Sequence, residues 1–221
     1  MLNHFFRDME RLTCEILKLA ATVEELIHTA IHALCDSRAD LADRVLRSDE
    51  AIDDWEVRIE EECLKILALH QPVAVDLRRV TAVLKINNDL ERMADLAVNI
   101  AERAIYLNKY CKGAAIPEKL EAMTAVAIRM VRGSLDAFVN LDADKARAIR
   151  ALDDEVDRYN REIIDDLKMS MRSDPDRIEA GLELFSATRH LERVADHAAN
   201  IAEDVVYLKE GEIIRHHHNL H

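Results

Sequence analysis

Two acidic segments of similar sequence carry the residues best suited to chemistry. They are LERMADLAVNIAE at 90–102 and LERVADHAANIAE at 191–203, and ten of their thirteen positions are identical. In each segment a Glu and an Asp are four residues apart, so that in a helix both side chains project from the same face. Such repeated pairs favour the binding of a cation by oxygen ligands. The two pairs are Glu91 with Asp95 and Glu192 with Asp196.

A second carboxylate pair precedes each of these segments, again with a spacing of four. If the chain forms antiparallel helices there, residues equidistant from the turn lie at the same height. Asp53 with Glu91, and Asp49 with Asp95, both centre on Pro72. We therefore expect four carboxylates to converge within about one helical pitch, ~5.4 Å, in each half. The corresponding pairs of the second half are Asp157 with Glu192 and Asp153 with Asp196, and both centre between Asp174 and Pro175.

Four neighbouring carboxylates raise one another's pKa values, and a multivalent cation reverses that unfavourable balance. Oxygen ligands suit Mg²⁺, Ca²⁺, Mn²⁺ or iron better than copper or structural zinc. Asn99 and Asn200, one turn beyond each Asp, could orient the ligands by hydrogen bonds or add further oxygens. The alternative is a solvated acidic face with ordinary surface ion pairs to Arg92 and Arg193. The spacing does not decide between one ion and several.

The helices that would position these pairs are indicated by composition and periodicity. The chain has 221 residues, 49% of them hydrophobic, with only four Gly and three Pro. This composition is typical of a nearly all-helical protein. Apolar residues recur at helical spacing, and the prolines fall where helices begin or turn. We predict an all-α fold with helices at residues 8–35, 39–70, 73–110, 116–140, 143–172 and 175–209.

The internal repeat extends over nearly the whole chain. The halves align at an offset of 104 residues up to Asp53 and at 101 from about Leu77 onward. The three-residue difference therefore falls at the turn between the second and third helix of each half. We predict two tandem three-helix bundles related by internal duplication, with a hinge around Gly113. The predicted parts are residues 1–112, residues 113–210 and a polar, His-rich tail at 211–221.

Charge and composition argue against several classes of protein. The formal net charge of −13 disfavours nucleic-acid binding, which needs a basic surface. It suits cations or basic patches on partner proteins, or it simply keeps the protein soluble. No uncharged run approaches the ~18 residues that cross a bilayer, and the N-terminus does not read as a signal peptide. The cysteines form no CxxC, and we interpret them as helix-packing thiols of a cytoplasmic protein. They are Cys14, Cys35, Cys63 and Cys111.

The two acidic segments, together with QPVAVDLR at 71–78, resemble the PhoU family of bacterial phosphate-uptake regulators across essentially the whole chain. The resemblance implies two three-helix bundles, often in a homodimer, and multinuclear iron or zinc clusters on E(D)xxxD motifs. It implies a cytoplasmic repressor of the phosphate-starvation response that bridges the ATPase subunit of a phosphate ABC transporter and a sensor histidine kinase. Membrane association would then be peripheral, through these partners. The implied ligands are Asp49, Asp53, Glu91, Asp95, Asp153, Asp157, Glu192 and Asp196.

Two other functions are kept as alternatives. A di-iron carboxylate oxidase or ferroxidase usually has Glu-x-x-His on two helices. Ala94 and Ala195 occupy the corresponding positions after Glu91 and Glu192, so we expect a protein that is not an enzyme. A helical scaffold without any metal is the second alternative.

Three further sets of residues are interpreted without a site. His28 and His32 are four residues apart, but arginine and aspartate stand at their counterparts in the second half. We therefore interpret them as a polar flank. Trp55 and Tyr159 are assigned to core packing. The histidines of the tail, RHHHNLH, fall outside the family pattern and would bind metal only adventitiously.

Overall fold

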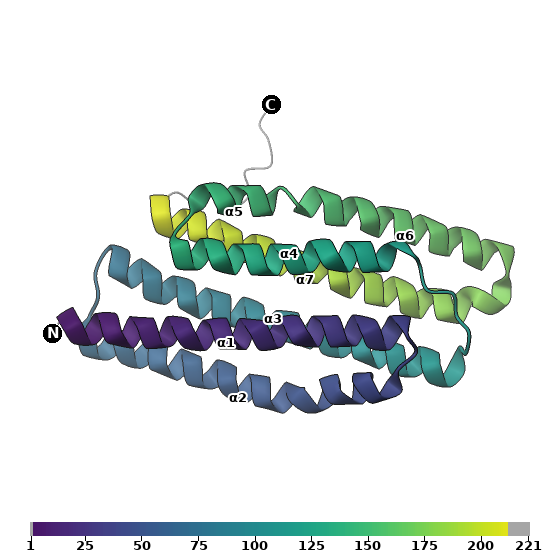
Figure 1. Cartoon of the computed structure of the whole chain (residues 1–221), viewed down its shortest axis with the longest axis horizontal. Coiled ribbons are helices and arrows are strands. Elements are labelled where there is room, and N and C mark those ends of the chain that lie inside the picture. The colour runs from purple at the N-terminus through teal and green to yellow at the C-terminus, as the bar shows by residue number, and fades with distance from the viewer. Residues whose placement is uncertain (1, 212–221) are drawn as a thin grey trace.

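The computed structural model describes residues 2–211, with side chains from residue 4, and this part of the chain contains helices and no strand. The helices lie side by side and run back and forth along the long axis of an elongated molecule (Figure 1). They are α1 (Leu2–Cys35), α2 (Ala39–His70), α3 (Val75–Tyr110), α4 (Lys119–Asn140), α5 (Ala143–Arg150), α6 (Asp153–Ser173), the short 3₁₀ helix η1 (Pro175–Arg177) and α7 (Ile178–Glu210).

The all-α prediction is confirmed, but one predicted helix is wrong as a single element. The segment 143–172 is broken by a turn at residues 151–152 into α5 and α6. A close approach to α4 accompanies the break, because a Cβ on Gly133 would lie 2.2 Å from Cδ1 of Ile149. The acidic residues that open α6 suit the positive end of a new helix. The first helix also begins earlier than predicted, at Leu2 rather than residue 8.

The last helical segment begins at Pro175, as the position of this proline predicted. The Asp174 carboxylate accepts a hydrogen bond of 3.1 Å from the Asp176 backbone N–H, and Pro175 occupies the first helical position. The first turn there is 3₁₀, and α7 itself begins at Ile178. Asp174 is therefore the N-terminal cap of this segment, whose first turn is 3₁₀ before it becomes α-helical.

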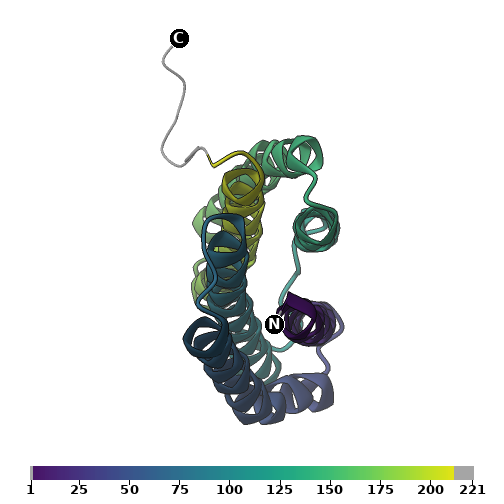
Figure 2. The same ribbon diagram turned by 90° about the vertical axis from the view of Figure 1, so that its left-hand side faces the viewer.

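The helices form two layers (Figure 2). One is a curved row of α2, α3, α7 and the α5–α6 pair. On its inner side, α1 packs against α2 and α3, and α4 packs against α5, α6 and α7. Each half is thus a three-helix unit. In the second half, the second helix of this unit is divided into α5 and α6. The third helices of the halves, α3 and α7, pack against each other and run antiparallel.

The apolar residues that recur at helical spacing in the first and fourth helices are buried. Val23 and Ile27 of α1, like Met130 and Val131 of α4, have no exposed surface. The buried side chains form one cluster that extends through both halves. The two units therefore share a continuous core instead of folding around separate ones. Because burial of apolar surface dominates the free energy of folding, the halves are expected to unfold together.

The cysteines agree only in part with their assignment to helix packing. Cys63 is buried, and desolvation raises its pKa to about 12. Cys14 is exposed, so its assignment to packing is wrong.

Trp55 and Tyr159 pack against the edge of the core. Within the described part of the chain, no helix combines the length and apolar character that a membrane span requires. The tail, apart from Gly211, lies outside the described residues.

Candidate metal centre

In the first half, the carboxylates of α2 and α3 face one another across the antiparallel pair. Desolvation raises the pKa of Asp49, and the negative charges of Asp53 and Asp95 raise it further. Desolvation likewise raises the pKa of Glu91, with additional contributions from Asp95 and Asp53. Each α3 carboxylate is therefore close to the α2 carboxylate that lies at the same distance from the turn. Arg92 partly offsets this charge, because its Nε is 3.3 Å from Glu91 Oε2.

The second half repeats the arrangement with a stronger effect. Desolvation raises the pKa of Asp153 to about 6, and Asp196 and Asp157 are the next largest causes. The pKa of Asp196 is raised by desolvation and then by Glu192 and Asp157. The negative charges on α6 and α7 thus raise one another's pKa values. The shift at Asp153 means that a proton, or a cation in its place, stabilises this group of carboxylates.

Among the predicted ligands of the second half, two buried oxygens lack a hydrogen-bonding partner within the described residues. They are Asp153 Oδ1 and Glu192 Oε2. The other Glu192 oxygen accepts a hydrogen bond of 2.7 Å from Arg189, so only half of this carboxylate is satisfied. A buried anionic oxygen without a partner is costly, and hard cations bind such oxygens. The residues present therefore fit an oxygen-coordinated metal ion.

The predicted ligand side chains nonetheless do not converge on a single point. Within residues 4–211, no three His, Cys, Asp or Glu side chains are already gathered as they would be around an ion. Asp95 and Asp157 have side chains that are 40% and 43% exposed, and Asp157 lies 3.6 Å from Arg161. The carboxylates thus form two open acidic faces, and binding would require rotamer changes that draw the outer side chains inward.

The predicted asparagines differ in position. Asn99 donates a hydrogen bond of 2.8 Å to the backbone oxygen of Asp95, which leaves its own side-chain oxygen available. Asn200 lines a hollow of about 700 Å³ together with Asp153 and Asp196. Asn200 is therefore placed beside the second carboxylate group, whereas the Asn99 amide is turned to its own helix.

Sequence reasoning missed three glutamates next to these groups. The charge of Glu102 contributes to the raised pKa of Asp49, and that of Glu56 contributes to the raised pKa of Glu91. Glu203 lies beside the hollow and accepts a hydrogen bond of 2.8 Å from Arg150. Glu102 and Glu203 close the two repeated segments, so identity at that position was a signal that could have found them. Nothing in the sequence distinguished Glu56.

The raised pKa values predict how the metal-free protein responds to pH. A carboxyl group whose pKa is higher in the folded than in the unfolded state stabilises the fold when protonated, and this stabilisation is lost as pH rises. For Asp153 this stabilisation is fully present below the ordinary pKa of 3.8 and is lost as the pH rises through the raised pKa of about 6. We expect the free energy of unfolding of metal-free protein to rise by about 1 kcal/mol or less between pH 7 and pH 5, after allowance for solvent screening.

Urea unfolding at the two pH values, in the presence of chelator, measures this difference. Asp153→Asn should reduce the gain. Asp144→Asn is the matched control, because Asp144 is almost fully exposed on α5. An equal gain in Asp153→Asn and in the unmodified protein would contradict the assignment.

Comparison with known proteins identifies the family. The PhoU domain matches the chain twice, at residues 16–104 and 120–205. The chain belongs to the PhoU family. The two matches coincide with the unit α1–α3 and the unit α4–α7, so the internal duplication seen in the sequence is a duplication of this domain.

Similar proteins support the same assignment over the full length. Two are called phosphate-specific transport system accessory protein PhoU homolog. The one from Pseudomonas aeruginosa is 37% identical over 97% of this chain and 88% of its own. The one from Aquifex aeolicus is 38% identical over 96% of each.

Solved structures agree with the fold. The crystal structure of PhoU from Pseudomonas aeruginosa superimposes with a TM-score of 0.89 at 37% identity, covering 94% of this chain and all of that one. The phosphate transport system regulatory protein PhoU from Streptococcus pneumoniae gives a TM-score of 0.88 at 30% identity, covering 95% of this chain and 99% of that one.

Proposed function

We propose that this protein is a metal-binding regulator of phosphate uptake that represses the phosphate-starvation response. The names of its relatives, accessory proteins of a phosphate-specific transport system, support the regulatory part of the proposal. The observation that carries the metal-binding part is the doubled arrangement of facing carboxylates, whose pKa values are raised in both halves.

The metal would be held by the four carboxylates of each half. Asp153 and Glu192 offer buried oxygens without partners, and the more exposed Asp157 and Asp196 would turn inward to complete the set. In the first half, Asp49, Asp53, Glu91 and Asp95 would act in the same way. Iron or zinc is the first choice by family resemblance, while Mn²⁺, Mg²⁺ and Ca²⁺ also suit oxygen ligands. The ion would neutralise the acidic faces and fix the spacing of α2 with α3 and of α6 with α7.

The proposed role is that of an adaptor and not of an enzyme. The protein would bind the ATPase subunit of a phosphate ABC transporter and a sensor histidine kinase in the cytoplasm, as a homodimer. Glu25 and His28, which alone have the spacing of a di-iron motif, are exposed on α1 and not on the helices that carry the carboxylates. No observation favours the oxidase alternative.

Deletion of the gene tests the regulatory proposal. In phosphate-rich medium, the deletion strain should express phosphate-starvation genes as strongly as phosphate-starved wild-type cells do, because the repressing adaptor is absent. A transcriptional reporter measures this directly, and a plasmid copy of the gene should restore repression. Normal repression in the deletion strain would refute the proposed function.

A further inference from the structure

Two histidines lie together on the exposed side of α1, near the end of that helix. The rings of His28 and His32 are one turn apart and stacked, with centroids separated by 6.0 Å and planes inclined by 21°. The His32 side chain is 60% exposed, and His28 is exposed as well. The sequence indicated only a polar flank at this place. The structure adds that the two imidazoles lie side by side and are open to solvent.

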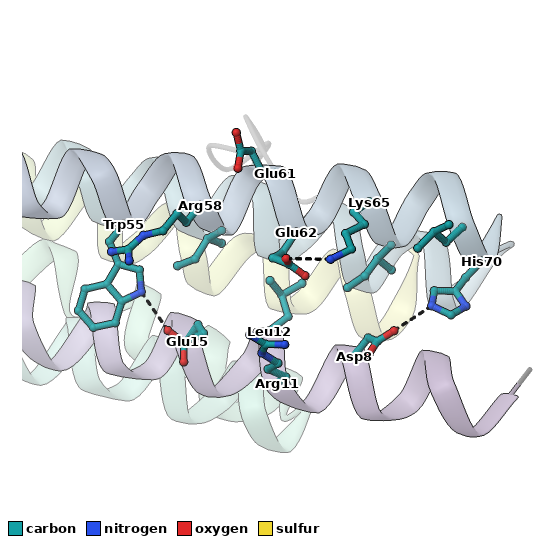
Figure 3. A pocket seen from close by; sticks show the side chains of 13 residues that line it. Asp8, Arg11, Leu12, Glu15, Trp55, Arg58, Glu61, Glu62, Lys65 and His70 are labelled. Carbon is teal, nitrogen blue, oxygen red and sulfur yellow. Dashed lines mark hydrogen bonds and ion pairs between the residues drawn. The ribbon is translucent and has the colours of Figure 1, made fainter.

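Two histidines elsewhere in the molecule have a different environment, because their rings bridge helices. Figure 3 shows His70 of α2 facing Asp8 of α1, with Nε2 of the histidine 3.0 Å from Oδ2 of the aspartate. Nδ1 of His197 on α7 is 2.8 Å from Oδ1 of Asp89 on α3. Within residues 4–211, His28 has no such partner for either ring nitrogen, and its ring contact is with the next histidine of its own helix. Its nitrogens are therefore available to a ligand from solvent.

A carboxylate is placed to orient the second ring of the pair. Oδ2 of Asp36 is 3.5 Å from Nδ1 of His32, and the Asp36 backbone N–H donates a hydrogen bond of 2.9 Å to the His32 carbonyl oxygen. A carboxylate beside Nδ1 favours the tautomer with its proton on that nitrogen, which leaves the lone pair of Nε2 for a metal. His32 also lies in the last turn of α1, where the helix dipole attracts positive charge.

The second half of the molecule uses the equivalent positions for ion pairs. At the offset of 104, the counterparts of the two histidines are Arg132 and Asp136. Arg132 donates from Nε to Glu24 of α1 at 2.7 Å, and Asp136 accepts a hydrogen bond from Lys145 of α5. The same positions of the duplicated unit therefore carry paired charges in one half and adjacent imidazoles in the other.

We propose that His28 and His32 together chelate a divalent transition-metal ion such as Zn²⁺, Ni²⁺ or Cu²⁺. Two histidines four residues apart lie on one helix face and can share an ion, and imidazole suits these metals. A Zn–N bond is about 2.0–2.1 Å long, so small rotations of the two exposed side chains bring both rings onto one ion. Water would fill the remaining positions, and Asp36 is the positioning residue.

This site differs from the facing carboxylates in place and in ligand chemistry. Its nitrogen ligands lie on α1, whereas the carboxylates lie on α2, α3, α6 and α7. Carboxylate oxygens suit hard cations such as Mg²⁺ and Ca²⁺, and imidazole nitrogens do not. Metal binding by the histidine pair is therefore independent of metal binding by the carboxylates and of the proposed regulatory function.

The experiment uses the full chain with ¹⁵N-labelled histidine, its tail histidines replaced by asparagine so that they do not compete for the ion. Titration with Zn²⁺ should shift the imidazole resonances of His28 and His32 together in one saturable step, with Nε2 as the bound nitrogen of His32. His28→Gln should weaken Zn²⁺ binding at His32 by about a hundredfold, because the second ligand is lost.

A second substitution tests the positioning residue. Asp36→Asn should weaken Zn²⁺ binding by about tenfold, as the loss of an orienting carboxylate does. In the metal-free variant, the ¹⁵N shifts of His32 should also show less of the tautomer protonated on Nδ1, which a merely structural role of Asp36 would not change. An unaltered affinity and tautomer in this variant would remove the orienting role.

Matched controls remove comparable groups elsewhere. His4→Gln removes an exposed histidine of the same helix, and Asp43→Asn removes an exposed acid of α2. Both should leave the affinity of the pair for Zn²⁺ unchanged, and circular dichroism confirms that every variant is folded.

The remaining outcomes would overturn the chelate. If His28 and His32 respond at different Zn²⁺ concentrations, or if His32 binds equally well in His28→Gln, the two rings act separately. If His4 responds at the same concentration as the pair, the binding is adventitious. A response confined to His197, beside Asp196 in the sequence, would place the ion at the carboxylates alone.

Discussion

Removal of bound metal is expected to lower the melting temperature of this protein by about 10–20 °C. An ion present at a hundred times its dissociation constant stabilises the folded state by ~2.7 kcal/mol, and the two proposed sites together contribute about 5 kcal/mol. Because the hydrophobic core runs through both halves, the chain should melt as one unit of more than 150 residues. For that size, 1 kcal/mol corresponds to roughly 2–4 °C.

Differential scanning calorimetry with and without chelator, on samples whose metal content is measured, provides the test. Helicity at 25 °C should be retained, because the buried apolar side chains and not the ion hold the helices together. The chelator effect should shrink when Glu91, Asp95, Glu192 and Asp196 are all replaced by their amides. A melting curve that chelator leaves unmoved, on protein shown to have lost metal, would mean that the acidic faces are only solvated surface.

Substitution within one half is expected to remove metal from that half alone. Asp49→Ala with Asp95→Ala should abolish the first site, because it deletes one ligand on α2 and the ligand that faces it on α3. Asp153→Ala with Asp196→Ala should abolish the second site for the same reason. Elemental analysis of protein purified without a tag should find about half the metal of the unmodified chain in either variant, and almost none in the combination.

Neighbouring acids provide the control for this prediction. Asp54 and Asp154 each directly follow a proposed ligand in the sequence, yet both are exposed. Their replacement by alanine should leave the metal content unchanged. Equal metal content in the unmodified chain and in a variant that lacks all eight carboxylates would remove the assignment entirely, whatever the single variants show.

The sequence by itself determined the repeat, the helical class and the facing of the carboxylates. These follow from local rules, because a spacing of four puts two side chains on one helix face and equal distance from a turn puts two helices in register. That reasoning paired Asp49 with Asp95 and Asp53 with Glu91, and the charges that shift the pKa values of Asp49 and Glu91 agree with it.

Only the tertiary structure decided how strongly each carboxylate is perturbed and which neighbours join it. Desolvation depends on what packs around a side chain, so the pKa of Asp153 reaches about 6 while no pattern in the sequence sets it apart from Asp49. Glu56 contributes to the first group because α2 and α3 bring it near Glu91, and its type and spacing gave no signal.

The break between α5 and α6 and the continuous core also required the tertiary structure. The break accompanies the contact between Gly133 and Ile149, which are sixteen residues apart on different helices. The shared core depends on α3 packing against α7, a contact between halves that each look complete in the sequence. Periodicity fixes the face that a residue occupies on its own helix, whereas packing between helices fixes what that face meets.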